Sequence, residues 1–326
     1  MAYALGMGGA EAAPTETWQQ RLVAQGPWPP AGMPPAAAAN PLAPRPEALE
    51  LGYRLFRETR FSANGYIGCV SCHQTDRAFT DGIARAQGIG PSPLNAPSLL
   101  NLAWMPRFGW QGNSASLTES SLRPLLDPHE HASDARRVAH TVRVADGLAC
   151  RWERVFAVSP QQQDDQAVLR RVTQTIALFT AQLSSARTPF DDWRDTLARG
   201  QPEARYPAAA RRGAILFAGR AACIQCHAGP VFSDGQIHRV EPGAVAMRTP
   251  PLRQVSVSAP YWHDGSATTL ADAVRRHRSL KGVPDLTDAE LVDLSAFMDT
   301  LTDGDGARRQ FPSLARSPCP STASGG

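Results

Sequence analysis

The pentapeptide Cys69-Val70-Ser71-Cys72-His73 recurs further along the chain as Cys223-Ile224-Gln225-Cys226-His227. Two thiols at this spacing add across the vinyl groups of a haem, and the following His supplies a ligand to its iron, so the pattern is the attachment motif of a c-type haem. A zinc half-site is the alternative, but neither copy is followed by the second Cys-x-x-Cys pair that such a site needs. The motifs therefore predict two covalently bound haem c groups and redox chemistry. The residues that bind them would be Cys69, Cys72 and His73 in one unit and Cys223, Cys226 and His227 in the other.

The surroundings of the two motifs also repeat. Residues 51–56 (Leu-Gly-Tyr-Arg-Leu-Phe) precede the first motif much as residues 212–217 (Arg-Gly-Ala-Ile-Leu-Phe) precede the second. Phe79-Thr80-Asp81-Gly82 and Phe232-Ser233-Asp234-Gly235 follow the two motifs. This indicates an internal duplication of a cytochrome c-like unit. A chain of 326 residues is also longer than one hydrophobic core usually serves.

Hydrophobic periodicity predicts three main helices: one that begins near Pro46, one from Asp164 to about Leu183 that joins the halves, and one that opens with the capping box Thr287-x-x-Glu290. Gly and Pro interrupt the segment from His73 to about Leu117, which we expect to be mostly loop. The predicted fold class is mainly α, with two cytochrome c-like haem domains, long loops and little strand. The expected division is a Pro/Ala-rich, extended N-terminal lead-in (1–46), a first haem domain (47–190), a second haem domain (191–310) and a C-terminal tail (311–326).

Composition excludes some classes of partner. The net charge of +3 is small and the charges are interspersed, which argues against nucleic acid as a ligand. The chain contains no run of about 20 apolar residues that could span a membrane. Because haem is attached to such motifs outside the bacterial cytoplasm, we expect a periplasmic protein. The first residues do not read as a signal peptide, so we expect the leader to have been cleaved or replaced.

Two of the six cysteines, Cys150 and Cys319, lie outside the haem motifs. In an oxidising compartment they could form a disulfide that ties the C-terminal tail to the first domain. Two free thiols are the alternative, and the sequence does not decide between them.

Several further segments, with both haem motifs in register, resemble the bacterial di-haem cytochrome c peroxidase family, which includes MauG. The resemblance extends from Glu47 to Leu301, and besides Phe79–Gly82 it rests on Leu55-Phe56, Asn95-Ala96-Pro97-Ser98-Leu99-Leu100-Asn101, Arg248-Thr249-Pro250-Pro251-Leu252-Arg253 and Pro260-Tyr261-Trp262-His263-Asp264-Gly265.

The resemblance implies unequal roles for the two haems. The haem of His73 would react with peroxide, and Glu130 would be the carboxylate that moves a proton between the peroxide oxygens. Trp110 occupies the place of the aromatic residue between the haems. A Gln that often neighbours the catalytic carboxylate is Ser120 here, which puts any role of that amide in doubt.

The axial ligands depart from typical members of the family. Many members close the resting peroxidatic haem with a second His, but no His lies between His73 and Asn95, so we expect this haem to be open in every redox state. At the position of the second haem's sixth ligand, where typical peroxidases have Met and MauG has Tyr, this chain has His277. We expect it on a helix whose inward face is formed by Leu270, Ala273, Val274 and His277. Met247 and Met298 are the alternatives.

The resemblance also implies a structural calcium between the haem domains. Asn95 matches the side-chain ligand, and Ser258 and Pro260 match the positions that supply backbone carbonyls. An all-oxygen set of this kind suits a hard cation.

Three functions are considered. The first is a MauG-like enzyme in which hydrogen peroxide generates a high-valent state shared by both haems, which then oxidises a Trp or Tyr of a partner protein. The second is a cytochrome c peroxidase that removes peroxide with electrons from a small cytochrome c or cupredoxin. The third is a non-enzymatic di-haem electron carrier. His277 and the missing closing His favour the first, whereas Ala221, where MauG has the Trp through which its protein substrate is oxidised, favours the second.

Overall fold

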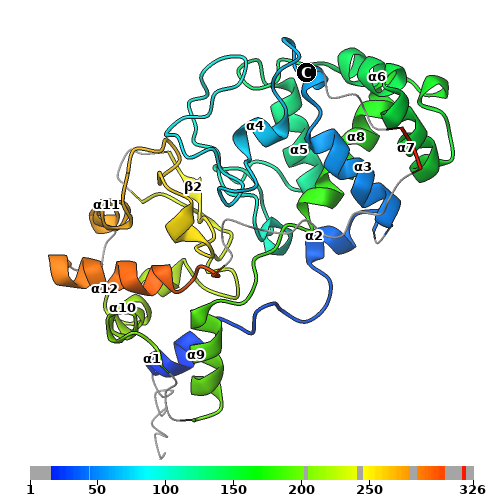
Figure 1. Ribbon diagram of the computed structural model, residues 1–326. Coiled ribbons are helices and arrows are strands. Elements are labelled where there is room, and N and C mark those ends of the chain that lie inside the picture. The colour runs from blue at the N-terminus through cyan, green and yellow to red at the C-terminus, as the bar shows by residue number, and fades with distance from the viewer. Residues whose placement is uncertain are drawn as a thin grey trace, which may run out of the picture.

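The computed structural model describes residues 16–43, 45–201, 205–240, 245–279, 285–304 and 318–320. The regular secondary structure of the described part is helical apart from one antiparallel pair of two-residue strands and four isolated bridges, which confirms the predicted fold class (Figure 1). The helices are α1 (Trp18–Val23), α2 (Pro35–Ala38), α3 (Pro46–Phe56), α4 (Cys69–Cys72), α5 (Leu117–Leu126), α6 (Ala135–Val144), α7 (Asp146–Phe156), α8 (Asp165–Thr180), α9 (Pro189–Ala198), α10 (Ala208–Ala218), α11 (Leu270–Arg275) and α12 (Asp288–Asp299), and the strands are β1 (Ile237–His238) and β2 (Met247–Arg248).

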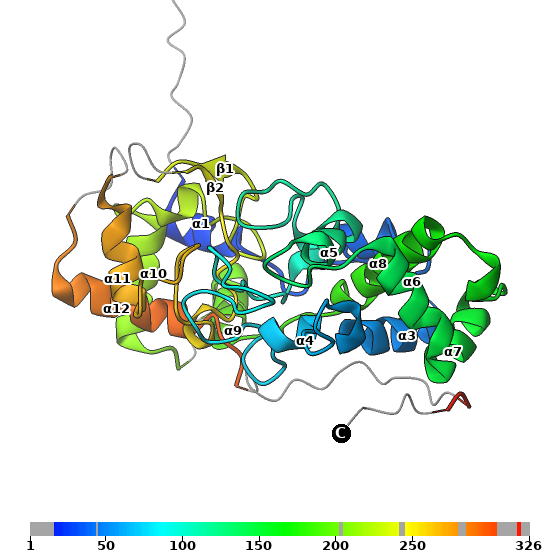
Figure 2. The same cartoon turned by 90° about the horizontal axis from the view of Figure 1, so that it is seen from above.

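Two groups of helices lie side by side along the molecule, and each has its own apolar core (Figure 2). In the first group α3, α5 and α6 pack around α8, whose residues Val168, Val172 and Phe179 are fully buried. In the second group α10 packs along α12. The predicted role of α8 as a helix that joins the halves is wrong, because α8 is the centre of the first core. The connection to α9 is made by residues 181–188.

The two repeated segments before the haem motifs pack against a neighbouring helix in the same way. Gly52 on α3 lies against the backbone of Thr175 on α8, and Gly213 on α10 lies against the backbone of Asp293 on α12. A Cβ at either glycine would overlap that backbone, so the residue type is required for two helices to pack this closely. The duplication seen in the sequence is therefore also a duplication of helix packing.

The N-terminal lead-in is not fully extended, contrary to our expectation. Thr17 and Gln20 form a capping box that opens α1, and Leu22 of this helix is buried in the second core. Periodicity did not predict α1, because a six-residue helix gives too short a periodic pattern to detect. The first turn of α2 carries Pro35, a position where the missing N–H costs no hydrogen bond.

Cys150 of α7 and Cys319 are joined by a disulfide with a Cα–Cα distance of 5.8 Å. Next to it, Arg151 donates to the Pro320 carbonyl at 2.8 Å and forms a buried ion pair with Glu50 at 2.8 Å. The first of the two alternatives for these cysteines is therefore the one present, and it anchors residues 318–320 to the first group of helices. Among the described helices, none has the length and apolar character needed to cross a membrane.

Candidate haem sites

The first haem motif forms the single turn of α4 and ends at His73. His73 Nδ1 lies 2.9 Å from the carbonyl of Phe79, a residue held at a φ of 60°. Because a carbonyl only accepts, Nδ1 carries the proton and Nε2 keeps its lone pair for a metal. Burial lowers the pKa of His73 below its usual value, which maintains this neutral form.

The second haem motif repeats this arrangement. His227 Nδ1 lies 3.1 Å from the carbonyl of Phe232, whose φ is 57°. Burial, and then the nearby His277, lower the pKa of His227 to about 4. In both units, the backbone carbonyl of the Phe that follows the motif thus accepts a hydrogen bond from Nδ1–H of the haem His.

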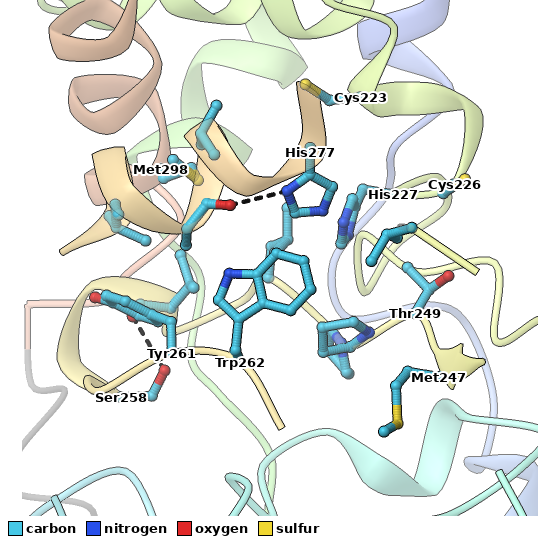
Figure 3. A pocket seen from close by; sticks show the side chains of 18 of the residues that line it. Cys223, Cys226, His227, Met247, Thr249, Ser258, Tyr261, Trp262, His277 and Met298 are labelled. Atoms are coloured by element: carbon cyan, nitrogen blue, oxygen red, sulfur yellow. Dashed lines mark hydrogen bonds between the residues drawn. The ribbon is translucent and has the colours of Figure 1, made fainter. Parts of the chain in front are cut away.

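A cavity of about 600 Å³ opens beside the second motif and is lined by Cys223, Cys226, His227 and His277 (Figure 3). The rings of His227 and His277 have centroids 6.5 Å apart. Two imidazoles that bind one metal from opposite sides, at the usual distance of about 2 Å, have centroids separated by roughly 6 Å. Two thiols, two facing imidazoles and an apolar cavity fit a haem c with two axial His ligands.

The sequence predicted that His277 lies on a helix. In the structure, α11 ends at Arg275 and His277 belongs to the 3₁₀ turn that follows it. Its Nδ1 lies 2.9 Å from the Ala273 carbonyl. The predicted inward face is nevertheless present, since Leu270, Ala273, Val274 and His277 all line the cavity. The alternative ligands Met247 and Met298 line it too, but the ring distance above favours His277.

Glu130 lies in the turn after α5, half-buried. Its carbonyl accepts the N–H of Ile89 at 2.9 Å, and Gly88 approaches its backbone so closely that a Cβ there would overlap it. Burial, and then Asp127, raise the pKa of Glu130 to about 7. After burial, the charge of Glu130 contributes most to raising the pKa of the Cys69 thiol, so the carboxyl group is close enough to act on the first haem motif.

His131, which the sequence analysis did not single out, lies next to Glu130 in the interior. Its Nδ1 lies 3.1 Å from the Pro124 carbonyl, and Nε2 is buried with no hydrogen-bond partner among the described residues. Burial, foremost, lowers its pKa and keeps the imidazole neutral. The only signal in the sequence was its place in the turn that carries Glu130.

Trp110 connects the two units. Its Nε1 donates to the Asn95 carbonyl at 2.8 Å, and its own carbonyl accepts the N–H of Arg248 at 2.7 Å. Trp110 also lines the cavity of the second motif. Its backbone and its ring are therefore fixed by segments from different halves of the chain.

The three residues predicted to bind calcium all line the cavity beside the second motif. They are Asn95, Ser258 and Pro260, and Trp110 lines the same cavity. The Asn95 amide nitrogen donates to the Ile83 carbonyl at 2.9 Å, and no donor among the described residues is bonded to its Oδ1. An amide oxygen of this kind is the type of ligand that a hard cation requires.

The two residues at which this chain departs from the family pattern, Ser120 and Ala221, lie in different parts of the structure. Ser120 lies half-buried on α5, the helix that leads to Glu130. Ala221 is 2 % exposed and lines the cavity of the second motif.

Comparison with known proteins identifies relatives that match most of the chain. The family model described as di-haem cytochrome c peroxidase matches residues 46–199. The chain is 32% identical to the methylamine utilization protein MauG of Methylorubrum extorquens over 82% of this chain and 81% of that protein. It is 30% identical to the cytochrome c551 peroxidase of Nitrosomonas europaea over 81% of this chain and 82% of that protein. The crystal structure of a MauG-like protein associated with microbial copper homeostasis superimposes with a TM-score of 0.71 at 26% identity, covering 86% of this chain and 97% of that one.

Proposed function

The chain belongs to the di-haem cytochrome c peroxidase family, and from this premise we propose that it uses peroxide in the manner of MauG, to oxidise a Trp or Tyr of a partner protein. As a member of this family it is an oxidoreductase that acts on peroxide and carries two haem c groups. The observation that carries the finer proposal is the facing pair His227 and His277. A second imidazole stabilises oxidised iron more than a thioether does, so this site suits the storage of oxidising equivalents better than the supply of electrons.

The peroxide chemistry requires the first site. When bound, the first haem would supply the redox-active iron, with His73 Nε2 as its ligand. Glu130 then takes the proton from one peroxide oxygen and returns it to the other, which leaves as water. A carboxyl group whose pKa burial has raised to about 7 can both accept and return a proton near neutral pH. Trp110, held by Asn95 and Arg248, is the proposed path for electrons between the two sites.

Removal of peroxide with electrons from a small cytochrome c or cupredoxin is the second candidate function. It is favoured by Ala221, because a buried Ala cannot relay an electron from a protein substrate as the Trp of MauG does. Under the first proposal, the electron must enter the second site by another route.

We predict that hydrogen peroxide, added to the fully oxidised protein, produces a rapid spectral change that persists for minutes and represents two oxidising equivalents. The rate should rise with pH through about 7, because only ionised Glu130 accepts the peroxide proton and the raised pKa keeps the group protonated below that value. Stopped-flow spectroscopy over a pH series measures both. A protein that reacts only after prior reduction would contradict the proposal. If reduced small cytochrome c then discharges the product within the mixing time, the second function is the correct one.

We also propose that a calcium ion binds Asn95 Oδ1 and the carbonyls of Ser258 and Pro260, since all three residues line the cavity beside the second motif. Removing the ion with a chelator should slow electron exchange between the haem sites, because Trp110 donates to the carbonyl of Asn95. Added Ca²⁺ should restore the rate and Mg²⁺ should not, since Mg²⁺ needs a smaller octahedral site. Metal analysis of the dialysed protein that finds no calcium, with no effect of the chelator, would remove this proposal.

A periplasmic location is proposed as well. The disulfide between Cys150 and Cys319 supports it, because disulfides persist in oxidising compartments.

A further inference from the structure

Arg248 of β2 is a buried cation without a carboxylate partner among the described residues. The side chain is 3 % exposed and lines the cavity of the second haem motif. Among the described residues no Asp or Glu forms an ion pair with it. Burial alone lowers its pKa to about 10, with no compensating charge. An unpaired buried charge is strongly destabilising, so this arrangement calls for an anion that the chain does not supply.

The other two buried arginines show how this chain treats such a group. Arg151 is 4 % exposed and pairs with Glu50 at 2.8 Å. Arg253 is 3 % exposed and pairs with Asp191 at 2.7 Å. Each has a carboxylate of its own, whereas Arg248, equally buried and lining the same cavity as Arg253, has none among the described residues. The difference points to a carboxylate on the ligand that fills the cavity.

The hydrogen bonds of Arg248 leave one end of the guanidinium for that ligand. Nε donates to the Gly109 carbonyl at 3.0 Å and Nη1 donates to the Thr249 carbonyl at 3.1 Å. No protein acceptor among the described residues is bonded to Nη2. The backbone N–H of Arg248 donates to the Trp110 carbonyl at 2.7 Å. Arg248 therefore holds two successive carbonyls of the Trp110 segment while its Nη2 remains for an acceptor in the cavity.

We propose that Arg248 binds a propionate carboxylate of the second haem and, through Gly109 and Trp110, ties the position of the bridging indole to that haem. This rests on the proposed function, in which Trp110 carries electrons between the two sites. A haem carries two propionates, and guanidinium is the side chain best shaped for a carboxylate. Arg248 is a positioning residue with two separable effects: its charge stabilises the reduced state of the second haem, and its Nε bond orders the Trp110 loop.

The test compares three variants with the wild-type holoprotein by potentiometric titration followed in the absorption spectrum. R248Q removes the charge, so the second haem should shift to a more negative potential. R275Q is the matched control, because Arg275 also lines the cavity but is exposed and already paired with Asp272 and Asp288. It should leave the potential near that of the wild type. Equal potentials in R248Q and R275Q would overturn the proposal.

R248K keeps the charge but cannot reproduce the Nε bond to Gly109. Its second haem should retain a potential close to the wild-type value, while electron exchange between the haems slows at least several-fold. The propionate bending band in the resonance Raman spectrum should shift in R248K, and an unchanged band would also overturn the proposal, even if R248Q does not fold. Titration and Raman measurement need no peroxide. Failure of the wild type to react with peroxide would therefore refute the proposed function, and the measurements on the Arg248 variants would still decide whether Arg248 binds the propionate.

Discussion

Glu130→Gln should slow the reaction of the oxidised protein with hydrogen peroxide by about 10²–10⁴-fold, the usual contribution of a general acid–base group. Gln has nearly the same shape as Glu, but its amide cannot take the peroxide proton. The pKa of about 7 that burial gives Glu130 makes it the group suited to this transfer near neutral pH. Single-mixing stopped-flow spectroscopy measures the rate, and the spectra before mixing should match those of the wild type, because Glu130 binds neither haem.

The rise of the rate through about pH 7 should also disappear in E130Q, since the titrating group is gone. Glu119→Gln is the matched control. Glu119 lies on α5, the helix that precedes the turn with Glu130, and its side chain is 41% exposed and paired with Arg123. Its loss should leave rate and pH profile unchanged. A rate in E130Q within twofold of the wild type would assign the proton transfer to another group, of which the neighbouring His131 is the nearest candidate.

His277→Met should give the second haem the spectrum of His/Met ligation and raise its reduction potential, because a thioether favours reduced iron more than imidazole does. The expectation follows from the centroid distance of 6.5 Å between His227 and His277. As a consequence, the two-equivalent product should become shorter-lived, since the second site would hold oxidising equivalents less well. Absorption and magnetic circular dichroism of both redox states identify the ligand.

Met247→Leu and Met298→Leu are the controls for that experiment, because both methionines line the same cavity. Neither change should alter the spectrum if His277 is the ligand. An unaltered spectrum in H277M together with an altered one in either Met variant would identify the thioether as the ligand and remove the main support for a MauG-like function.

The sequence predicted best the features that repeat or have a fixed spacing. The start of α3 at Pro46 and the capping box at Thr287 were predicted correctly. The glycines that let α3 and α10 pack on their partners were visible only as a repeated letter, and their reason, a close helix–helix approach, needed coordinates. Local pattern thus predicted the elements, and the packing explains why the pattern is duplicated.

What the sequence did not predict depends on contacts between distant segments. Arg248 was part of a recognised segment, but its lack of a carboxylate partner is visible only once the burial of the arginines can be compared. His131 has no spacing signal of its own, and its buried, unpartnered Nε2 follows from the way the turn folds back on Pro124. The end of α11 at Arg275 was also missed, because a change from α to 3₁₀ geometry leaves the side-chain pattern almost unaltered.

The disulfide between Cys150 and Cys319 has a consequence for how the protein is made. Six thiols can pair in fifteen ways, and four of the six cysteines belong to the haem motifs. Once haem has been attached to those four, a single pairing remains, and it is the one observed. If oxidation came first, any of the four could be captured in a wrong bond and lost to the haem. Haem attachment before oxidation would therefore protect the Cys150–Cys319 pair from wrong partners.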